Sequence, residues 1–155
     1  MTNATIIVCP SCGALNRVPA ARPALTAKCG GCRHALFEHH PVEVDEAGFE
    51  RHVRSNGIPV LLDVWAPWCG PCRTMAPQFE RATSLLEPDV RLLKLNADQP
   101  PNVSARPGVR GIPAMFLIDR GAVVAQTTGA MNAEAIARWA RDNLSTHSTP
   151  NGGSP

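Results

Sequence analysis

The chain has 155 residues, a formal net charge of +2 at pH 7 and 44% hydrophobic residues. This length leaves room for one domain of ordinary size and a small additional unit. The small charge does not by itself indicate a nucleic acid or a membrane surface as partner. No stretch approaches the roughly 20 apolar residues of a membrane span, and residues 1–8 lack the basic start and apolar run of a signal peptide. We therefore expect a cytoplasmic protein with reduced thiols and no membrane partner.

Residues 1–36 contain two C-x-x-C pairs, Cys9 with Cys12 and Cys29 with Cys32, and sixteen residues separate the pairs. This spacing is typical of a zinc site with four thiolate ligands. About 36 residues bury too little surface to fold alone, so the metal would have to supply folding energy. Four thiolates leave no open coordination position. We therefore predict one structural Zn²⁺, with a pair of dithiols or disulfides as the alternative.

Three histidines follow the fourth cysteine, namely His34, His39 and His40. Because four thiolates already complete the zinc shell, we interpret them as solvated side chains. The same segment has a mild basic excess and no acidic residue before Glu38. On a small unit such an excess is usually a solvated face. Aromatic residues do not alternate with the basic ones near these cysteines, so we do not expect nucleic acid as a partner.

Alternating strands and helices are predicted from residue 37 onward. Residues 37–44 read as a linker that runs into a first strand at 41–44, and Asp45 can cap a helix that ends near Ser55. The nearly continuous apolar run 59–65 is typical of a strand covered on both faces. Apolar residues at helical spacing then predict a helix over 71–86, in which Pro77 should cause a kink.

The second half of the chain predicts a strand at 90–95, a short helix at 102–109 and a hairpin of strands 114–118 and 122–128. A final helix is expected over 132–144, followed by a polar tail, 146–155, that we expect to be disordered. The order of these elements predicts an α/β fold with a mixed sheet and helices on both of its faces.

A third C-x-x-C pair, Cys69 and Cys72, lies where the apolar strand meets the following helix. The free N–H groups and the macrodipole of a helix N-terminus favour a thiolate, and Pro71 suits the first helical turn. Cys69 should be exposed and attack a disulfide, while Cys72, one turn further on, should be shielded and resolve the mixed disulfide. A half zinc site or an inert structural pair is the alternative reading.

Asp63 places a carboxyl group within the predicted apolar strand, and this position calls for a chemical explanation. Burial of an unpaired carboxylate is costly and raises its pKa. Such a group behind the site can accept the proton of Cys72 as this residue becomes a nucleophile. Lys94 on the neighbouring strand can tune that titration, although a surface lysine with a buried stem is the alternative. Trp65 reads as a core residue and Trp68 as the exposed rim of a groove.

The stretch Trp65-Ala66-Pro67-Trp68-Cys69-Gly70-Pro71-Cys72-Arg73 resembles the thioredoxin family closely. Asp63 matches the buried acid of that family, Gly111-Ile112-Pro113 its cis-proline loop, and Gly129 its late glycine. Lys94-Leu95-Asn96-Ala97-Asp98 matches its central strand. Together with the cysteine-rich start, the chain is most similar to zinc-ribbon-bearing bacterial thioredoxins of the thioredoxin 2 type.

This resemblance implies a thioredoxin fold over residues 45–145, preceded by a small zinc ribbon at 1–36. It implies a redox-active disulfide, Cys69–Cys72, and the following roles for other residues. The further catalytic residues would be Asp63, Lys94 and Pro113, and the substrate-binding residues would be Trp68, Gly70, Pro71, Ile112 and Gly129. A cis Pro113 would place the Ile112 backbone beside Cys69, ready to bind an extended substrate strand. Gly129 can also be read as only a turn residue.

The implied activity is that of a protein-disulfide reductase, because the Gly70-Pro71 dipeptide resembles the reducing members of the superfamily. Its partners would be disulfide-containing proteins and thioredoxin reductase, which would recharge the dithiol with electrons from NADPH. Two other hypotheses stay open. The ribbon can be a partner-binding module that carries the redox domain along. It can also be a redox sensor that releases zinc when its cysteines are oxidised.

Overall fold

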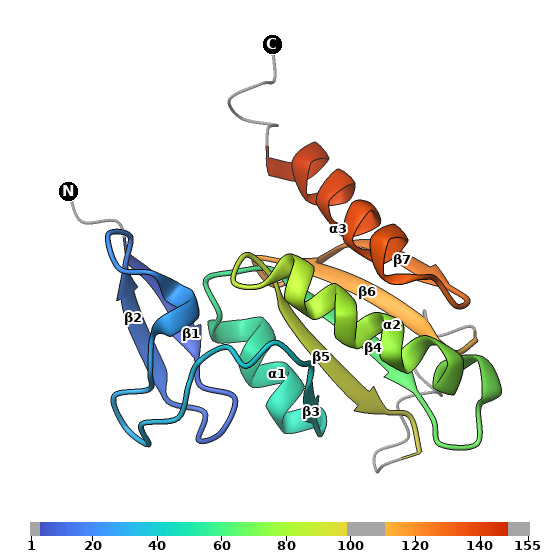
Figure 1. Cartoon of the computed structure of the whole chain (residues 1–155), viewed down its shortest axis with the longest axis horizontal. Coiled ribbons are helices and arrows are strands. Elements are labelled where there is room, and N and C mark those ends of the chain that lie inside the picture. The colour runs from blue at the N-terminus through green and yellow to red at the C-terminus, as the bar shows by residue number, and fades with distance from the viewer. Residues whose placement is uncertain (1–3, 99–110, 149–155) are drawn as a thin grey trace.

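The computed structural model describes residues 4–98 and 111–148, and it consists of a small N-terminal ribbon beside a five-stranded sheet with three α-helices (Figure 1). The ribbon pairs two antiparallel strands and contains one short 3-10 helix: β1 (Ala4–Val8), β2 (Leu15–Pro19) and η1 (Ala24–Thr26). The short helix expected at 102–109 lies outside the described residues. Within the described part of the chain, no helix has the length and apolar character needed to cross a membrane.

The main sheet has the strand order β3-β5-β4-β6-β7. Its strands are β3 (Val42–Val44), β4 (Val60–Trp65), β5 (Arg91–Asn96), β6 (Ala114–Asp119) and β7 (Ala122–Thr128). The strands β3, β5 and β4 are parallel, and β6 is antiparallel to both β4 and β7. The predicted mixed sheet is therefore confirmed.

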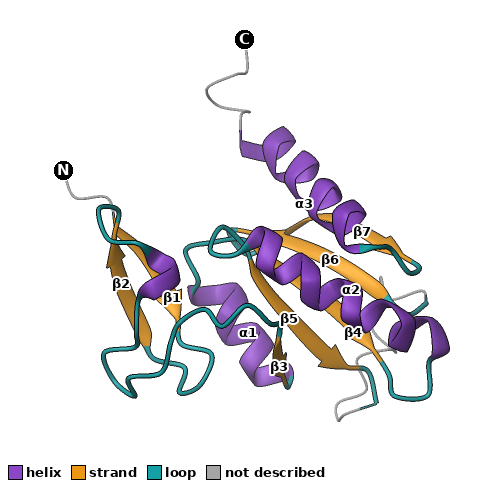
Figure 2. Ribbon diagram, viewed as in Figure 1, coloured by secondary structure: helices purple, strands orange, loops and turns teal. Residues whose placement is uncertain are grey.

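Helices cover both faces of this sheet, as predicted (Figure 2). They are α1 (Glu46–Ser55), α2 (Gly70–Leu86) and α3 (Ala133–Ser148). Because side chains alternate along a strand, Leu61 of β4 joins the core under α2 and α3 with Phe79 and Ile136. Its neighbour Leu62 joins the opposite core, against which Phe49 of α1 packs.

Local sequence signals explain where the helices begin, but one predicted helix end was wrong. The Asp45 side chain caps α1 by accepting a hydrogen bond from the Gly48 backbone N–H at 2.8 Å.

The last helix, α3, continues four residues beyond 144, to Ser148, although a disordered tail was expected from residue 146. Serine, threonine and histidine cost little in a helix, and the chain reaches its next proline only at Pro150.

The ribbon packs against the end of α1 and the beginning of β5. The Gly57 N–H donates to the Ile6 carbonyl oxygen at 2.7 Å, and the Val8 N–H donates to Asn56 Oδ1 at 2.9 Å. A Cβ atom at Gly57 would lie 3.1 Å from Ile6 backbone atoms, so this close approach favours glycine. Phe37, in the segment read as a linker, is buried in the core of the ribbon.

Arg91, the first residue of β5, connects the two parts through backbone carbonyl groups. Its side chain is only 1% exposed, and Nη2 donates to Leu36 O at 2.8 Å and to Val8 O at 3.3 Å. The guanidinium also lies 4.5 Å from the Phe37 ring centroid, and Nη1 lies 3.9 Å from Glu87 Oε2. The ribbon is therefore anchored by a buried cation that belongs to the main sheet.

Candidate active site and metal centre

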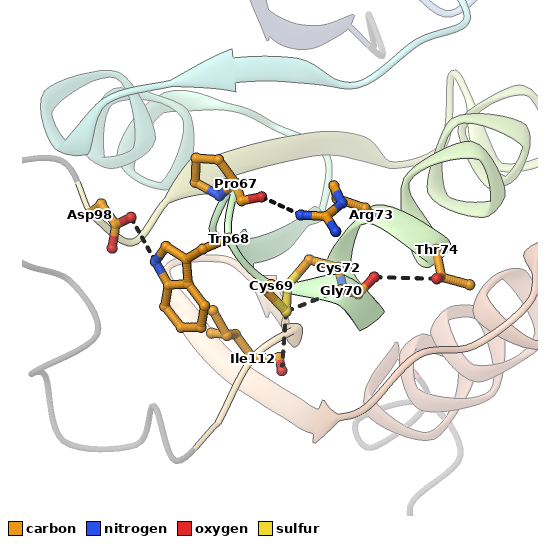
Figure 3. Close-up of a disulfide and its surroundings, with 9 residues drawn as sticks. All are labelled: Pro67, Trp68, Cys69, Gly70, Cys72, Arg73, Thr74, Asp98 and Ile112. Carbon is orange, nitrogen blue, oxygen red and sulfur yellow. Dashed lines mark hydrogen bonds between the residues drawn. A yellow bond between two sulfur atoms is a disulfide. The ribbon is translucent and has the colours of Figure 1, made fainter.

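Cys69 and Cys72 form a disulfide where β4 gives way to α2 (Figure 3). Cys69 is the N-cap residue of α2, and its Sγ accepts a hydrogen bond from the Cys72 backbone N–H at 3.2 Å. The helix begins at Gly70, which puts Pro71 in the first turn as expected. An N–H group directed at Sγ stabilises negative charge there, so the geometry favours a Cys69 thiolate once the disulfide is reduced.

The predicted exposure of Cys69 was wrong, because its side chain is 5% exposed and that of Cys72 is 3% exposed. Both cysteines form a small buried cluster with Ala66, and Trp65 and Ile112 pack against that cluster. The Ile112 carbonyl oxygen lies 3.8 Å from Cys69 Sγ. The loop that carries Ile112 therefore covers the sulfur, which a sequence without tertiary contacts does not reveal.

The loop beside the disulfide contains a cis peptide bond between Ile112 and Pro113, as the resemblance implied. The Pro113 carbonyl oxygen accepts a hydrogen bond from the Gly129 N–H at 2.9 Å. Gly129 has a φ of +99°, a conformation that favours glycine. Apart from each glycine's own chain neighbours, no atom of the described residues lies within 4 Å of the position of a Cβ there or at Gly70. The described residues therefore leave open space beside the backbone at both glycines.

Trp68 is exposed, as predicted, with 67% of its surface accessible. Its Nε1–H donates to Asp98 Oδ2 at 2.8 Å, as Figure 3 shows. The role of Asp98 was missed, because thirty residues separate it from Trp68. The signal that was available is topological: β4 and β5 are parallel, so the residues that follow them meet at one edge of the sheet.

Asp63 is 1% exposed, and its Oδ1 accepts no hydrogen bond from the described residues. Burial raises the pKa of Asp63 to about 7, an effect that the Lys94 charge opposes and the Glu43 charge supports. The register pairs Asp63 with Lys94 across β4 and β5, and Lys94 with Glu43 across β5 and β3. The ammonium of Lys94 lies 4.5 Å from the Trp65 ring centroid. Glu43 is the residue of this group that sequence reasoning missed.

The four ribbon cysteines meet as predicted, with their sulfur atoms within 4.8 Å of one another. Two of the separations, Cys9 to Cys32 and Cys12 to Cys29, are 3.6 Å. A tetrahedral Zn²⁺ with Zn–S bonds of about 2.3 Å requires sulfur atoms about 3.8 Å apart. The donor set therefore fits zinc, and its closed shell fits a structural ion.

Backbone N–H groups support a thiolate at Cys29 of this centre, whereas burial and the neighbouring sulfur atoms raise the pKa of Cys32. Cys29 Sγ accepts from Gly31 N at 3.3 Å and from Cys32 N at 3.5 Å. The Cys32 N–H and then the Asn16 amide are the main causes that lower the pKa of Cys29 to about 6. Asn16 also accepts from the Gly30 N–H at 2.9 Å through its Oδ1. The loop and the strand thus both supply hydrogen bonds around the Cys29 sulfur.

The histidines that follow the metal centre have separate positions. His34 is exposed, and its Nδ1 lies 3.4 Å from Cys32 Sγ, at the edge of the sulfur cluster. The His39 backbone N–H donates to Glu87 Oε1 at 3.0 Å, and the His40 ring approaches Glu38. The metal group found among the described residues consists of the four cysteines alone.

Two family models match separate parts of the chain. The model described as "Thioredoxin 2, N-terminal", a zinc ribbon, matches residues 8–34, and the model described as "Thioredoxin" matches residues 40–142. The two matches correspond to the sulfur cluster and to the sheet that carries the disulfide.

Individual proteins show the same similarity. Thioredoxin C-3 of Corynebacterium nephridii is 39% identical over 139 residues, which cover 90% of this chain and 95% of that protein. The thioredoxin of Haemophilus influenzae is 37% identical over 66% of this chain and 96% of its own length. A solved structure, that of a mutant thioredoxin from Halobacterium salinarum, shares the fold with a TM-score of 0.60 at 24% identity, over 69% of this chain and 93% of that chain.

Proposed function

The chain belongs to the thioredoxin family and is a thiol–disulfide oxidoreductase, and we propose that it uses Cys69 and Cys72 to reduce disulfides of other proteins. The observation that carries this proposal is the disulfide at the start of α2, with the Ile112–Pro113 loop against it. Dithiol–disulfide exchange is favoured by an N–H group that stabilises the first sulfur as a thiolate, and backbone that a substrate can reach would help to position the disulfide.

The reaction consists of two exchanges at sulfur. The Cys69 thiolate attacks one sulfur of the substrate disulfide, an S–S bond forms between them, and the other substrate sulfur leaves as a thiolate. The Cys72 thiol then loses its proton and its sulfur attacks Cys69 Sγ, so that the first substrate sulfur also leaves as a thiolate. Two electrons have passed to the substrate, and the Cys69–Cys72 disulfide remains.

Asp63 is proposed as the acceptor of the Cys72 proton. Its pKa of about 7 lets it take up and release a proton near neutral pH, which is the condition for efficient general base catalysis. Lys94 would tune this titration, and Pro113 would hold the Ile112 backbone beside the reacting sulfur.

Substrate would bind as an extended strand along the surface formed by Trp68, Gly70, Pro71, Ile112 and Gly129. The Ile112 backbone would supply the main-chain hydrogen bonds of that strand. Because Gly70 and Gly129 have no side chain, the backbone of the substrate could approach the backbone of this chain closely at both positions.

The partners proposed for this cycle are disulfide-containing proteins and thioredoxin reductase, which would restore the dithiol with electrons from NADPH in the cytoplasm. We further propose that residues 1–36 act as a zinc ribbon and residues 45–145 as the catalytic domain, joined by 37–44. The Zn²⁺ would be held by Cys9, Cys12, Cys29 and Cys32, where it would neutralise thiolate charge and supply folding energy.

The proposal is tested by insulin reduction coupled to NADPH and thioredoxin reductase, with the zinc-loaded full chain. We expect rapid NADPH consumption that Cys69→Ser abolishes. Cys72→Ser should instead accumulate a mixed disulfide between Cys69 and the substrate, visible by mass spectrometry and released by dithiothreitol. A folded wild-type protein that neither reduces insulin nor forms such an adduct would overturn the proposal.

A sensing role for the zinc centre is a second candidate, and the exposure of its sulfur atoms favours it. Cys12 is exposed and Cys32 is partly exposed, so peroxide can reach them without unfolding of the ribbon. A chromogenic zinc indicator would report release of the ion during peroxide titration. If no zinc is released at doses that oxidise Cys69, the centre is structural only.

A further inference from the structure

Three charged side chains stand in a row across three neighbouring strands on the face of the sheet that α2 covers. Glu43 on the edge strand β3 is paired in register with Lys94 on β5, and Lys94 is paired with Asp63 on β4. Residues that are paired in neighbouring strands point to the same face of the sheet. The lysine therefore has a carboxyl group on either side, one buried and one near solvent.

Trp65 contacts two residues of this row, Glu43 and Lys94. It lies two residues after Asp63 on β4, so it shares that face of the sheet. Its Nε1–H donates to Glu43 Oε2 at 3.2 Å, and its ring centroid lies 4.5 Å from Lys94 Nζ. The same indole packs against the cluster that contains Cys69 and Cys72. One side chain thus donates to the glutamate, lies beside the lysine ammonium and packs against the cluster that contains the redox disulfide.

We propose that Glu43 is a positioning residue of the redox site, which competes with Asp63 for the positive charge of Lys94 and so sets how readily Asp63 accepts the proton of Cys72. This inference rests on the proposed reductase chemistry. Glu43 does not touch the substrate or the reacting sulfur atoms. It acts through Lys94 and Trp65.

The electrostatic signs agree with this arrangement. Burial raises the pKa of Asp63, the ammonium of Lys94 lowers it, and the charge of Glu43 raises it again. Partial burial raises the pKa of Glu43, while Lys94 and the Trp65 hydrogen bond lower it. On β6 the partner of Asp63 is Met115, which carries no charge. On α2, the proposed reaction uses the Cys72 thiol as the proton donor to Asp63. Without Glu43, burial alone would oppose the effect of Lys94 on the Asp63 pKa.

Glu43→Gln tests the proposal, because the amide oxygen still accepts from Trp65 while the negative charge is removed. Carbon-13 NMR of the Asp63 carboxyl group in the oxidised, zinc-loaded full chain measures the titration directly. We expect the Asp63 pKa to fall by on the order of half a unit or more. The acid limb of the rate at which Cys72 resolves a preformed Cys69 mixed disulfide should move to lower pH by the same amount.

Three further variants separate the possible causes of such a shift. Glu43→Lys should move the titration in the same direction and further. Glu50→Gln removes an exposed carboxylate of α1 that pairs with Arg54 at 3.8 Å, and it should leave the titration unchanged. In the Asp63→Asn background, Glu43→Gln should no longer alter the pH profile of resolution.

An unchanged Asp63 pKa in folded Glu43→Gln protein would overturn the inference. The inference would also fail if the resolution profile shifted equally with and without Asp63. Failure of the proposed function looks different: the NMR shift would be present, but the wild-type chain would not reduce insulin.

Discussion

Asp63 and His52 are buried ionisable side chains, with exposures of 1% and 3%. Burial raises the pKa of Asp63 to about 7 and lowers the pKa of His52 to about 3, because in both cases it disfavours the charged form. His52 accordingly stays neutral and pairs with the Asn56 amide at 2.7 Å. Any group whose pKa differs between the folded and unfolded states makes the stability depend on pH.

Asp63→Asn should stabilise the protein by an amount that depends on pH. The folded carboxyl keeps its proton up to about pH 7, whereas in the unfolded chain it titrates near 3.8. The wild type therefore loses stability as pH rises from about 4 to about 7, and the uncharged amide does not. The gain in unfolding free energy should be near zero at about pH 3.5 and on the order of 3–4 kcal/mol at about pH 8.

Urea unfolding of oxidised wild-type and variant protein across this pH range measures the gain. Asp89→Asn, at an exposed position, is the matched control and should show no such trend. A gain that is constant with pH would mean that packing, rather than ionisation, distinguishes the two side chains. Asp63→Asn should also slow disulfide reduction, since it removes the proposed acceptor of the Cys72 proton.

At the scale of elements, β5 serves two parts of the molecule. Its first residue, Arg91, binds two backbone carbonyl groups of the ribbon, and its fourth, Lys94, lies between the two carboxyl groups beside the redox site. Burial lowers the pKa of Arg91 to about 10, which still leaves it charged at neutral pH. A buried cation of this kind persists only where several acceptors surround it.

Arg91→Met should destabilise the chain by about 2–4 kcal/mol, because Val8 O, Leu36 O and the Glu87 carboxylate lose their buried partner. Denaturant unfolding monitored by tryptophan fluorescence measures this loss. Arg54→Met removes an exposed pair with Glu50 instead, and it should cost less than about 1 kcal/mol. A nearly neutral Arg91→Met would show that the methionine packs well enough to replace the hydrogen bonds.

At the scale of the whole molecule, the ribbon and the sheet share one buried boundary. The core of the ribbon is small, and its fully buried residues include two of the zinc ligands. Its first strand contacts the end of α1, and the carbonyl groups that Arg91 binds flank the sulfur cluster in sequence. Loss of the ion should therefore affect the catalytic domain as well as the ribbon.

Chelation of zinc should lower the melting temperature of the whole chain by on the order of 5 °C or more. We expect the ribbon to lose its fold without the ion, and Arg91 then loses its two carbonyl partners. Differential scanning calorimetry should show one transition that shifts as a unit, and added zinc should restore it. The shift should be smaller in Arg91→Met protein.

The contrasting outcome is an unchanged main transition with the ribbon melting separately. It would show that the two parts fold independently and that the buried contacts between them contribute little to stability.

The sequence by itself determined the features that depend on local spacing. Four thiolates in two C-x-x-C pairs predict a zinc centre wherever the ribbon lies, since the tight turns need only nearby residues. Cys69 and Cys72 at the junction of strand and helix predict a redox pair for the same reason. The alternation of apolar runs with helical periodicity, together with short turns, predicted the mixed sheet and its covering helices.

Only the tertiary structure decided the contacts between residues far apart in the chain. The burial of Cys69 under Ile112, the pairing of Trp68 with Asp98, and the anchoring of the ribbon by Arg91 follow no local pattern. The position of Glu43 beside Lys94 is of the same kind, because β3 is paired with β5 rather than with the next strand in sequence. Strand order places these side chains together, and strand order is set by packing of the whole chain.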